Sequence, residues 1–97
     1  MRSRTIKPGF FQNEQLADLP ALDRLLFAGL WCIADKAGRI EDRPRKIRAE
    51  LFPYENVDCD AMLDSLAKAG FVTRYQVDDV RVVQVVNFEK HQNPHPR

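Results

Sequence analysis

Apolar residues between positions 20 and 36 recur three and four residues apart, and the charged residues of that stretch fall off this stripe. Such spacing is typical of a helix with one buried face. Pro20 suits the first turn of the helix and Gly38 suits its termination. The pattern predicts a central core helix over 20–36, preceded by a short turn that Asn13 caps. The expected apolar stripe consists of Leu22, Leu25, Leu26, Leu30, Trp31, Ile33 and Ala34.

Two shorter helices are predicted in the middle of the chain. Asp42 is the expected cap of the first, which has a proline in its first turn and runs to about Leu51. Asp58 is the expected cap of the second, and Gly70 is its stop. Before this pair, 39–41 is long enough only for a minor strand or an extended connector. The residues expected to face the core are Ile47, Leu51, Phe52, Cys59, Met62, Leu63 and Leu66.

Beyond Gly70 the apolar period changes from 3.6 to 2. Two β-branched and aromatic runs, 71–77 and 80–86, flank the two-residue loop Asp78-Asp79, which predicts a β-hairpin. Asp79 would need a positive φ in such a turn. The order of helix, short extended piece, two helices and hairpin predicts an α+β fold of the winged-helix type, with a three-helix helix-turn-helix core and the hairpin as its wing.

The length of 97 residues allows one domain, and 44% hydrophobic with 30% charged residues is ordinary for a globular protein. No apolar run is long enough to cross a bilayer, and the N-terminus lacks the apolar core of a signal peptide. Cys32 and Cys59 belong to no spaced ligand set, so we expect reduced thiols and a cytoplasmic protein without membrane contact. The expected boundaries are a basic arm at 1–12, the winged-helix domain at 13–88 and a polar tail at 89–97.

The net charge of +1 hides two basic zones. Residues 1–12 hold three cations and no acid, and residues 39–50 hold five cations against three acids. On a helix Arg45 and Arg48 lie one turn apart on the solvent side, where they can clamp adjacent phosphates, although a solvated and balanced helix face is the alternative. The candidate nucleic-acid contacts are Arg43, Arg45, Lys46 and Arg48, then Arg74 and Arg81 on the wing, and Arg2, Arg4 and Lys7 in the arm.

The third helix does not fit base reading. Its positions off the apolar stripe include Asp60 and Asp64, which would face phosphate, so we expect DNA contacts from the second helix, the wing and the arm instead. No catalytic set, glycine-rich phosphate loop or HExxH motif is present, and the chain reads as a non-enzyme without cofactor. His91 and His95 have the i, i+4 spacing of helical zinc ligands, but the prolines beside them oppose a helix, so no metal is expected.

Six short runs stand out along the chain: IKPGFF at 6–11, LFAGLW at 26–31, GRIEDRP at 38–44, LFPY at 51–54, AGFV at 69–72 and NFEKHQ at 87–92. Together they resemble the N-terminal winged-helix segment of phage and prophage replication-initiator or replisome-organiser proteins. The resemblance implies a DNA-binding module in replication initiation, with other replication proteins as partners. The alternative is a winged helix used for protein interaction or self-association, including a homodimer, through the acidic third helix and Phe10-Phe11.

Overall fold

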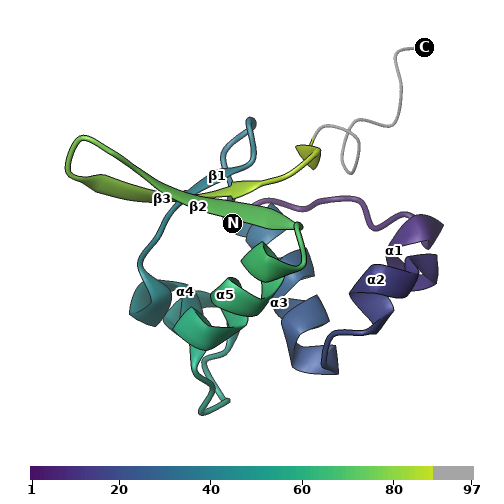
Figure 1. The fold of residues 1–97 in the computed structure, drawn as a ribbon. Helices are drawn as coiled ribbons and strands as arrows, with labels where there is room; N and C mark the ends of the chain where they lie inside the picture. Colours follow the sequence, from purple (N-terminus) through teal and green to yellow (C-terminus); the bar gives the residue numbers. More distant parts are fainter. Residues whose placement is uncertain (89–97) are drawn as a thin grey trace.

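The computed structural model describes residues 1–88, which form a small α+β domain of five helices and a three-stranded antiparallel sheet (Figure 1). The polar tail expected at 89–97, with His91 and His95, lies outside the described residues. The elements are α1 (Pro8–Gln12), α2 (Glu14–Ala17), α3 (Ala21–Ile33), β1 (Arg39–Glu41), α4 (Pro44–Leu51), α5 (Cys59–Lys68), β2 (Val72–Val77) and β3 (Val80–Val85).

The sheet has the strand order β1-β3-β2, so the hairpin predicted from the period of two is present and the short extended piece is its third strand. Ile40 pairs with Val83, and Thr73 pairs with Gln84. The turn differs from expectation in one respect, because the residue with positive φ is Asp78 (54°) and not Asp79. Aspartate tolerates this left-handed conformation better than most residues with a side chain.

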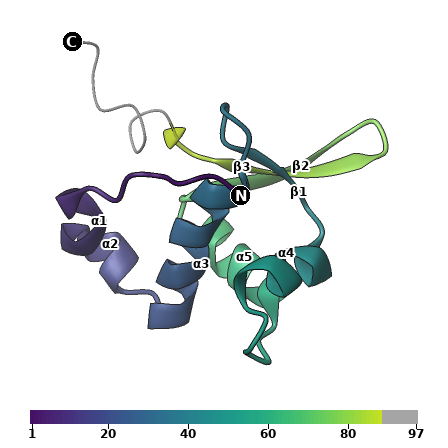
Figure 2. The ribbon, with the colours of Figure 1, turned by 180° about the vertical axis from the view of Figure 1, so that it is seen from behind.

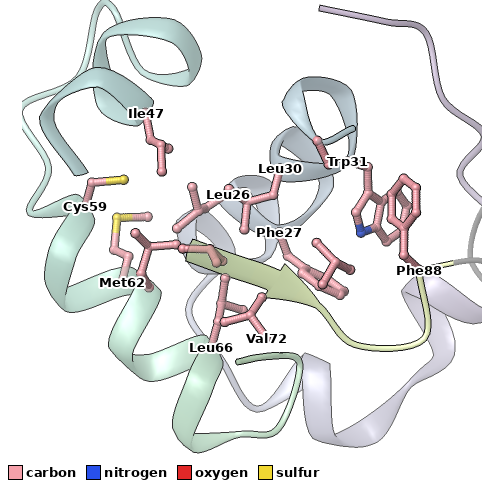
Figure 3. Close-up of a cluster of buried hydrophobic side chains, with 14 of the residues drawn as sticks. Leu26, Phe27, Leu30, Trp31, Ile47, Cys59, Met62, Leu66, Val72 and Phe88 are labelled. Atoms are coloured by element: carbon pink, nitrogen blue, oxygen red, sulfur yellow. The ribbon is translucent and has the colours of Figure 1, made fainter. Parts of the chain in front are cut away.

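Helices α3, α4 and α5 lie on one side of the sheet, and their apolar faces meet the sheet residues in a single core (Figures 1, 2 and 3). Trp31 of α3 is 2% exposed and packs edge-on against Phe27 and Phe10, with ring centroids 5.3 and 5.4 Å apart. The predicted core residues of α5 are all buried, namely Cys59, Met62, Leu63 and Leu66. Asp58 caps α5 as expected, because its side chain accepts from the Ala61 N–H.

The central helix is present, but its buried face is narrower than predicted. Leu22 and Leu25 are 42% and 55% exposed, whereas Asp23, expected off the stripe, is buried. The buried face of α3 therefore begins at Asp23. Leu22 and Leu25 lie on a neighbouring face of the helix, which no other element covers within residues 1–88. The short helices α1 and α2 reach the core mainly through Phe10 and Leu16, which leaves this stripe open.

Gly38 does not end the central helix as predicted. The last residue of α3 is Ile33, and its C-cap residue Ala34 already has an extended backbone. Gly38 instead has φ of +82° in the turn that leads into β1. A Cβ at this position would lie 2.6 Å from the Cβ of Phe88, which is buried beside it. Glycine is required here both by the backbone conformation and by this close approach.

Candidate nucleic-acid interface

The helix α4 is short and strongly two-sided. Its buried side chain Ile47 and its half-buried Leu51 attach it to the core, while Arg45 and Lys46 are exposed. Pro44 occupies the first helical position, where its missing N–H costs nothing. Asp42 was the expected cap, but it does not cap this helix. The N-cap residue is Arg43, which makes no side-chain cap hydrogen bond. The positive end of the helix dipole therefore has no carboxylate cap of its own.

A surface hollow of about 690 Å³ lies around the start of α4, and we call it the basic hollow. The Asp42 N–H donates to the Arg81 carbonyl at 2.8 Å, which holds the start of strand β3 beside the start of α4. The structure thus brings together cations from two elements that are far apart in the sequence. The cations that line the basic hollow are Arg43, Arg45, Lys46, Arg48 and Arg81, and the one acid among its lining residues is Asp42.

The cations of the basic hollow have few partners of their own. Arg43 reaches Glu41 only at 3.9 Å, with both side chains more than half exposed, so this pair contributes little. Arg48, expected on the solvent side, is half-buried, and its shielded Nε has no hydrogen-bond partner among residues 1–88. A shielded donor without an acceptor is costly, and an anion entering the hollow would supply compensating charge.

Arg74, which the sequence grouped with the exposed phosphate contacts, is held within the domain by two carboxylates. Its Nε and Nη2 donate to the two carboxylate oxygens of Asp42 at 2.8 and 2.9 Å, and its Nη2 also donates to Asp60 at 2.7 Å. The Arg74 side chain is 17% exposed and that of Asp42 only 2%. These hydrogen bonds, first that to Asp42, raise the pKa of Arg74. Arg74 instead ties β2 to the starts of α4 and α5.

A signal for this role was present in the strand pattern. Arg74 lies two residues after buried Val72, and alternate residues of a strand share one face of the sheet. Arg74 is therefore on the face that the helices cover, where a cation needs a buried partner. Its partner Asp42 is 32 positions away, which local spacing does not reveal.

The acids of α5 are also paired. The hydrogen bond from Arg74 lowers the pKa of Asp60, and Asp64 lies 3.4 Å from Lys68 one turn later on the same helix. Asp58 is used as the cap. The carboxylates on the exposed face of α5 are therefore compensated by cations of the domain. None of the described cations on this face is free to contact base edges.

The first residues of the chain cross the C-terminal end of α3 (Figure 2). Arg4 donates from Nε to the Trp31 carbonyl at 2.9 Å and from Nη2 to the Ala34 carbonyl at 3.2 Å, and its guanidinium lies over the Phe88 ring. Carbonyls at a helix end lack partners within the helix, and a cation there also suits the helix dipole. Arg4 is thus a helix-capping residue, and its predicted nucleic-acid contact would break these bonds.

The other two cations of the expected arm lie away from the basic hollow. Arg2, whose backbone N–H donates to the Cys32 carbonyl at 2.8 Å, lines a second hollow of about 400 Å³ that it shares with Lys46. Acids balance the cations there. Those acids are Asp35, Glu41 and Glu50. Lys7 precedes α1 as its N-cap residue and lines neither hollow.

The remaining candidate chemistry is sparse. Within residues 1–88 no three metal-ligating side chains gather in one place. Burial raises the pKa of the Cys59 thiol to about 11, which keeps it neutral and unreactive at pH 7. None of the helices in this part of the chain combines the length and the apolar character that a membrane crossing needs. Comparison of the chain with protein-family models, with curated proteins and with solved structures finds no match.

Proposed function

We propose that this protein is a winged-helix module that binds DNA through phosphate contacts in the basic hollow. The observation that carries the proposal is the gathering of five cations at the start of α4, around one paired acid. In this proposal α4 and α5 form the helix-turn-helix pair and β2 and β3 form the wing. The proposed contacts are Arg43, Arg45, Lys46, Arg48 and Arg81.

The charge distribution supports backbone binding over base reading. Phosphates are recognised by clustered cations and by helix N-termini, and these contacts carry no sequence information. The α5 helix, which would enter the major groove in a helix-turn-helix complex, exposes the carboxylates of Asp60 and Asp64, each held by a cation. The protein is therefore expected to bind duplexes of different sequence with similar affinity.

The resemblance to phage and prophage replication initiators supports a role in replication initiation, with DNA and replication proteins as partners. Several of the residues that carry the resemblance have structural roles here, among them Gly38, Phe52 and Phe88. Two free cysteines, Cys32 and Cys59, suit a reducing compartment, so we place this activity in the cytoplasm.

The proposal is tested by fluorescence anisotropy with labelled duplexes of two unrelated sequences and one single strand of equal length. Five neutralised phosphates predict that duplex affinity falls by roughly 10² to 10³ between 50 and 200 mM salt. The two duplexes should show the same affinity within about threefold, because backbone contacts do not read bases. A flat titration at 50 mM salt would refute DNA binding, and single-strand binding alone would refute the duplex geometry.

A further inference from the structure

The end of the molecule formed by α1, α2 and α3 carries an apolar surface. A hollow of about 680 Å³ lies there, and its lining is mostly apolar. Phe11 is 73% exposed and Leu25 is 55% exposed, both at its edge, and Ile6 is 50% exposed beside them. Leu22, 42% exposed, lies one helical turn before Leu25. We call the surface made by these four side chains the α1–α3 face.

Four large apolar side chains on one small face are unusual for a surface that only meets water. Single exposed leucines are normal, but a contiguous patch marks an interaction surface. The contrast within the molecule is clear, because three of the four exposed residues of α4 are charged, whereas the exposed residues of α3 at this face are alanine and leucine. We propose that a second copy of this chain covers the α1–α3 face, so that the protein forms a two-fold dimer.

The pattern along α3 is complementary to itself. Ala21, Leu25 and Ala28 line the hollow from one side of the helix, with the large residue near the middle and a small residue about one turn away on each side. This small-large-small order reads the same in both directions along the helix. Two antiparallel copies of α3 related by a two-fold axis near Leu25 would therefore set Leu25 against its own copy and Ala21 against Ala28 of that copy, so that apolar side chains meet along the whole stripe.

The charged rim of this face also fits a copy of itself. Arg24 donates to the carbonyls of Ala17 and Leu19, at 2.9 and 2.7 Å, and meets no carboxylate among residues 1–88. On α2, which lines the hollow through Ala17, Glu14 and the C-cap residue Asp18 are exposed and form no ion pair in the same part of the chain. A rim with both signs is attractive to an identical rim turned by a two-fold axis, whereas a partner of one sign would find repulsion on half of it.

The available area is consistent with a reversible dimer. From their exposed fractions, the four side chains offer on the order of 400 Å² of apolar surface per copy, about half of the ~800 Å² that each partner buries in a standard interface. The polar rim would supply the remainder, in the usual ratio of apolar to polar area. A small apolar centre of this kind is typical of weak and reversible association.

The dimer would leave DNA binding free. In both views α1 and α2 lie at one end of the molecule and α4 lies at the other (Figures 1 and 2). Pairing through the α1–α3 face would therefore turn the two basic hollows away from each other. The dimerisation proposal does not depend on DNA binding, and either one can fail alone.

Sedimentation velocity of the full chain without DNA, from about 5 to 500 μM, tests the proposal. We expect a monomer–dimer equilibrium that depends far less on salt between 50 and 500 mM than DNA binding does, because salt screens the charged rim and leaves the apolar contacts at the centre. Leu25→Lys should weaken dimerisation by at least about tenfold, because it buries a charge at the axis. The matched control is Val80→Lys, which makes the same change at a 48% exposed valine of β3, outside the α1–α3 face.

Each outcome decides the question. A parent protein that stays monomeric at 500 μM, or a Leu25→Lys variant that dimerises like the parent, would overturn the proposal. Equal weakening by Val80→Lys would also overturn it, because the surface would then be wrong. If Leu25→Lys fails to show a cooperative thermal transition, Phe11→Ser on α1 replaces it, and the same loss of dimer is expected from that variant.

Discussion

The helices α4 and α5 pack against each other, yet they carry charge in opposite ways. On α4 the cations gather around the basic hollow, and their one ion pair within residues 1–88, between Arg43 and Glu41, is long and exposed. On α5 every exposed carboxylate has a use within the domain: Asp58 as the cap, Asp60 with Arg74, and Asp64 with Lys68. Charge that is compensated within the domain builds the fold, whereas charge left without partners is available to a ligand.

The largest expected effect is on stability and comes from the buried ion pair between Arg74 and Asp42. Asp42→Ala leaves the guanidinium of Arg74 in a poorly solvated site without its main partner, and should lower the free energy of unfolding by about 3 kcal/mol. Replacing both by apolar residues, as Asp42→Leu with Arg74→Met, should bring stability back to within about 1 kcal/mol of the parent. Urea unfolding of the three proteins measures this.

The exposed pair on α5 is the control for that experiment. Lys68→Ala breaks the Lys68–Asp64 pair, whose side chains are 80% and 55% exposed, and should change stability by no more than about 0.5 kcal/mol. If Asp42→Ala were equally mild, Arg74 would be a weakly held cation, and it would return to the list of possible phosphate contacts.

The next largest effect is on DNA affinity and concerns the exposed cations of the basic hollow. Arg45→Glu with Arg81→Glu reverses two exposed charges of the basic hollow, so DNA affinity at 100 mM salt should fall by at least about 30-fold, and the salt dependence should become shallower. Stability should change by no more than about 0.5 kcal/mol for each substitution. Fluorescence anisotropy and urea unfolding give the two readouts.

The matched control reverses one exposed lysine outside the basic hollow, as Lys36→Glu, and is compared with Arg45→Glu alone. The two variants make the same change in net charge, so a uniform effect of overall charge would weaken DNA binding equally in both. Equal weakening by these two single variants would contradict a local site at α4.

A smaller effect is expected when the acids of α5 are neutralised. Asp60→Asn with Asp64→Asn removes two carboxylates that already have cationic partners, so DNA binding should tighten by no more than about fivefold. Tightening of 50-fold or more, measured by the same anisotropy titration, would mean that α5 lies directly against phosphate.

The smallest effect concerns Asp23, a buried carboxylate that pairs with no cation within residues 1–88. Desolvation raises the pKa of Asp23 above its ordinary value of 3.8, so the folded state holds this proton more tightly than the unfolded chain does. The stability linked to this group is present below pH 3.8 and is lost as the pH rises through the higher folded pKa. Asp23→Asn should therefore raise the melting temperature at pH 7.

The pH dependence separates this explanation from simple repacking. The gain in melting temperature from Asp23→Asn should shrink as the pH falls toward 3.8, because the parent carboxyl is then protonated as well. A gain of the same size at pH 3.5 and at pH 7 would show that ionisation of Asp23 is not its cause.

Local pattern was sufficient for most of the elements. The period of 3.6 located α3, α4 and α5, and the period of two located β2 and β3, because each signal lies within the element itself. The helix α1 was missed inside the expected arm, although Pro8 at its first position is a known start signal. A five-residue helix is too short to show a periodic stripe.

The charged residues were harder to assign than the apolar ones. Arg4 and Arg74 looked like the other exposed cations, yet both are held by groups about 30 positions away. Those partners are two helix-end carbonyls and the carboxylate of Asp42, and no local spacing brings them together. Composition could therefore identify a basic zone at 39–50 and the strand pattern could name Arg81 as a candidate on the wing, while the fold was needed to select the free members and to bring Arg81 beside α4.

The place of β1 in the sheet determines when the chain can complete its fold. Arg39 pairs with Gln84, so β1 waits for a strand more than 40 residues further along, and the loop between them contains both α4 and α5. Closing such a loop costs entropy before any strand contact compensates for it. During synthesis, β1 and the start of α4 cannot settle until β3 has left the ribosome. A nascent chain that ends before Val80 should therefore remain sensitive to proteases.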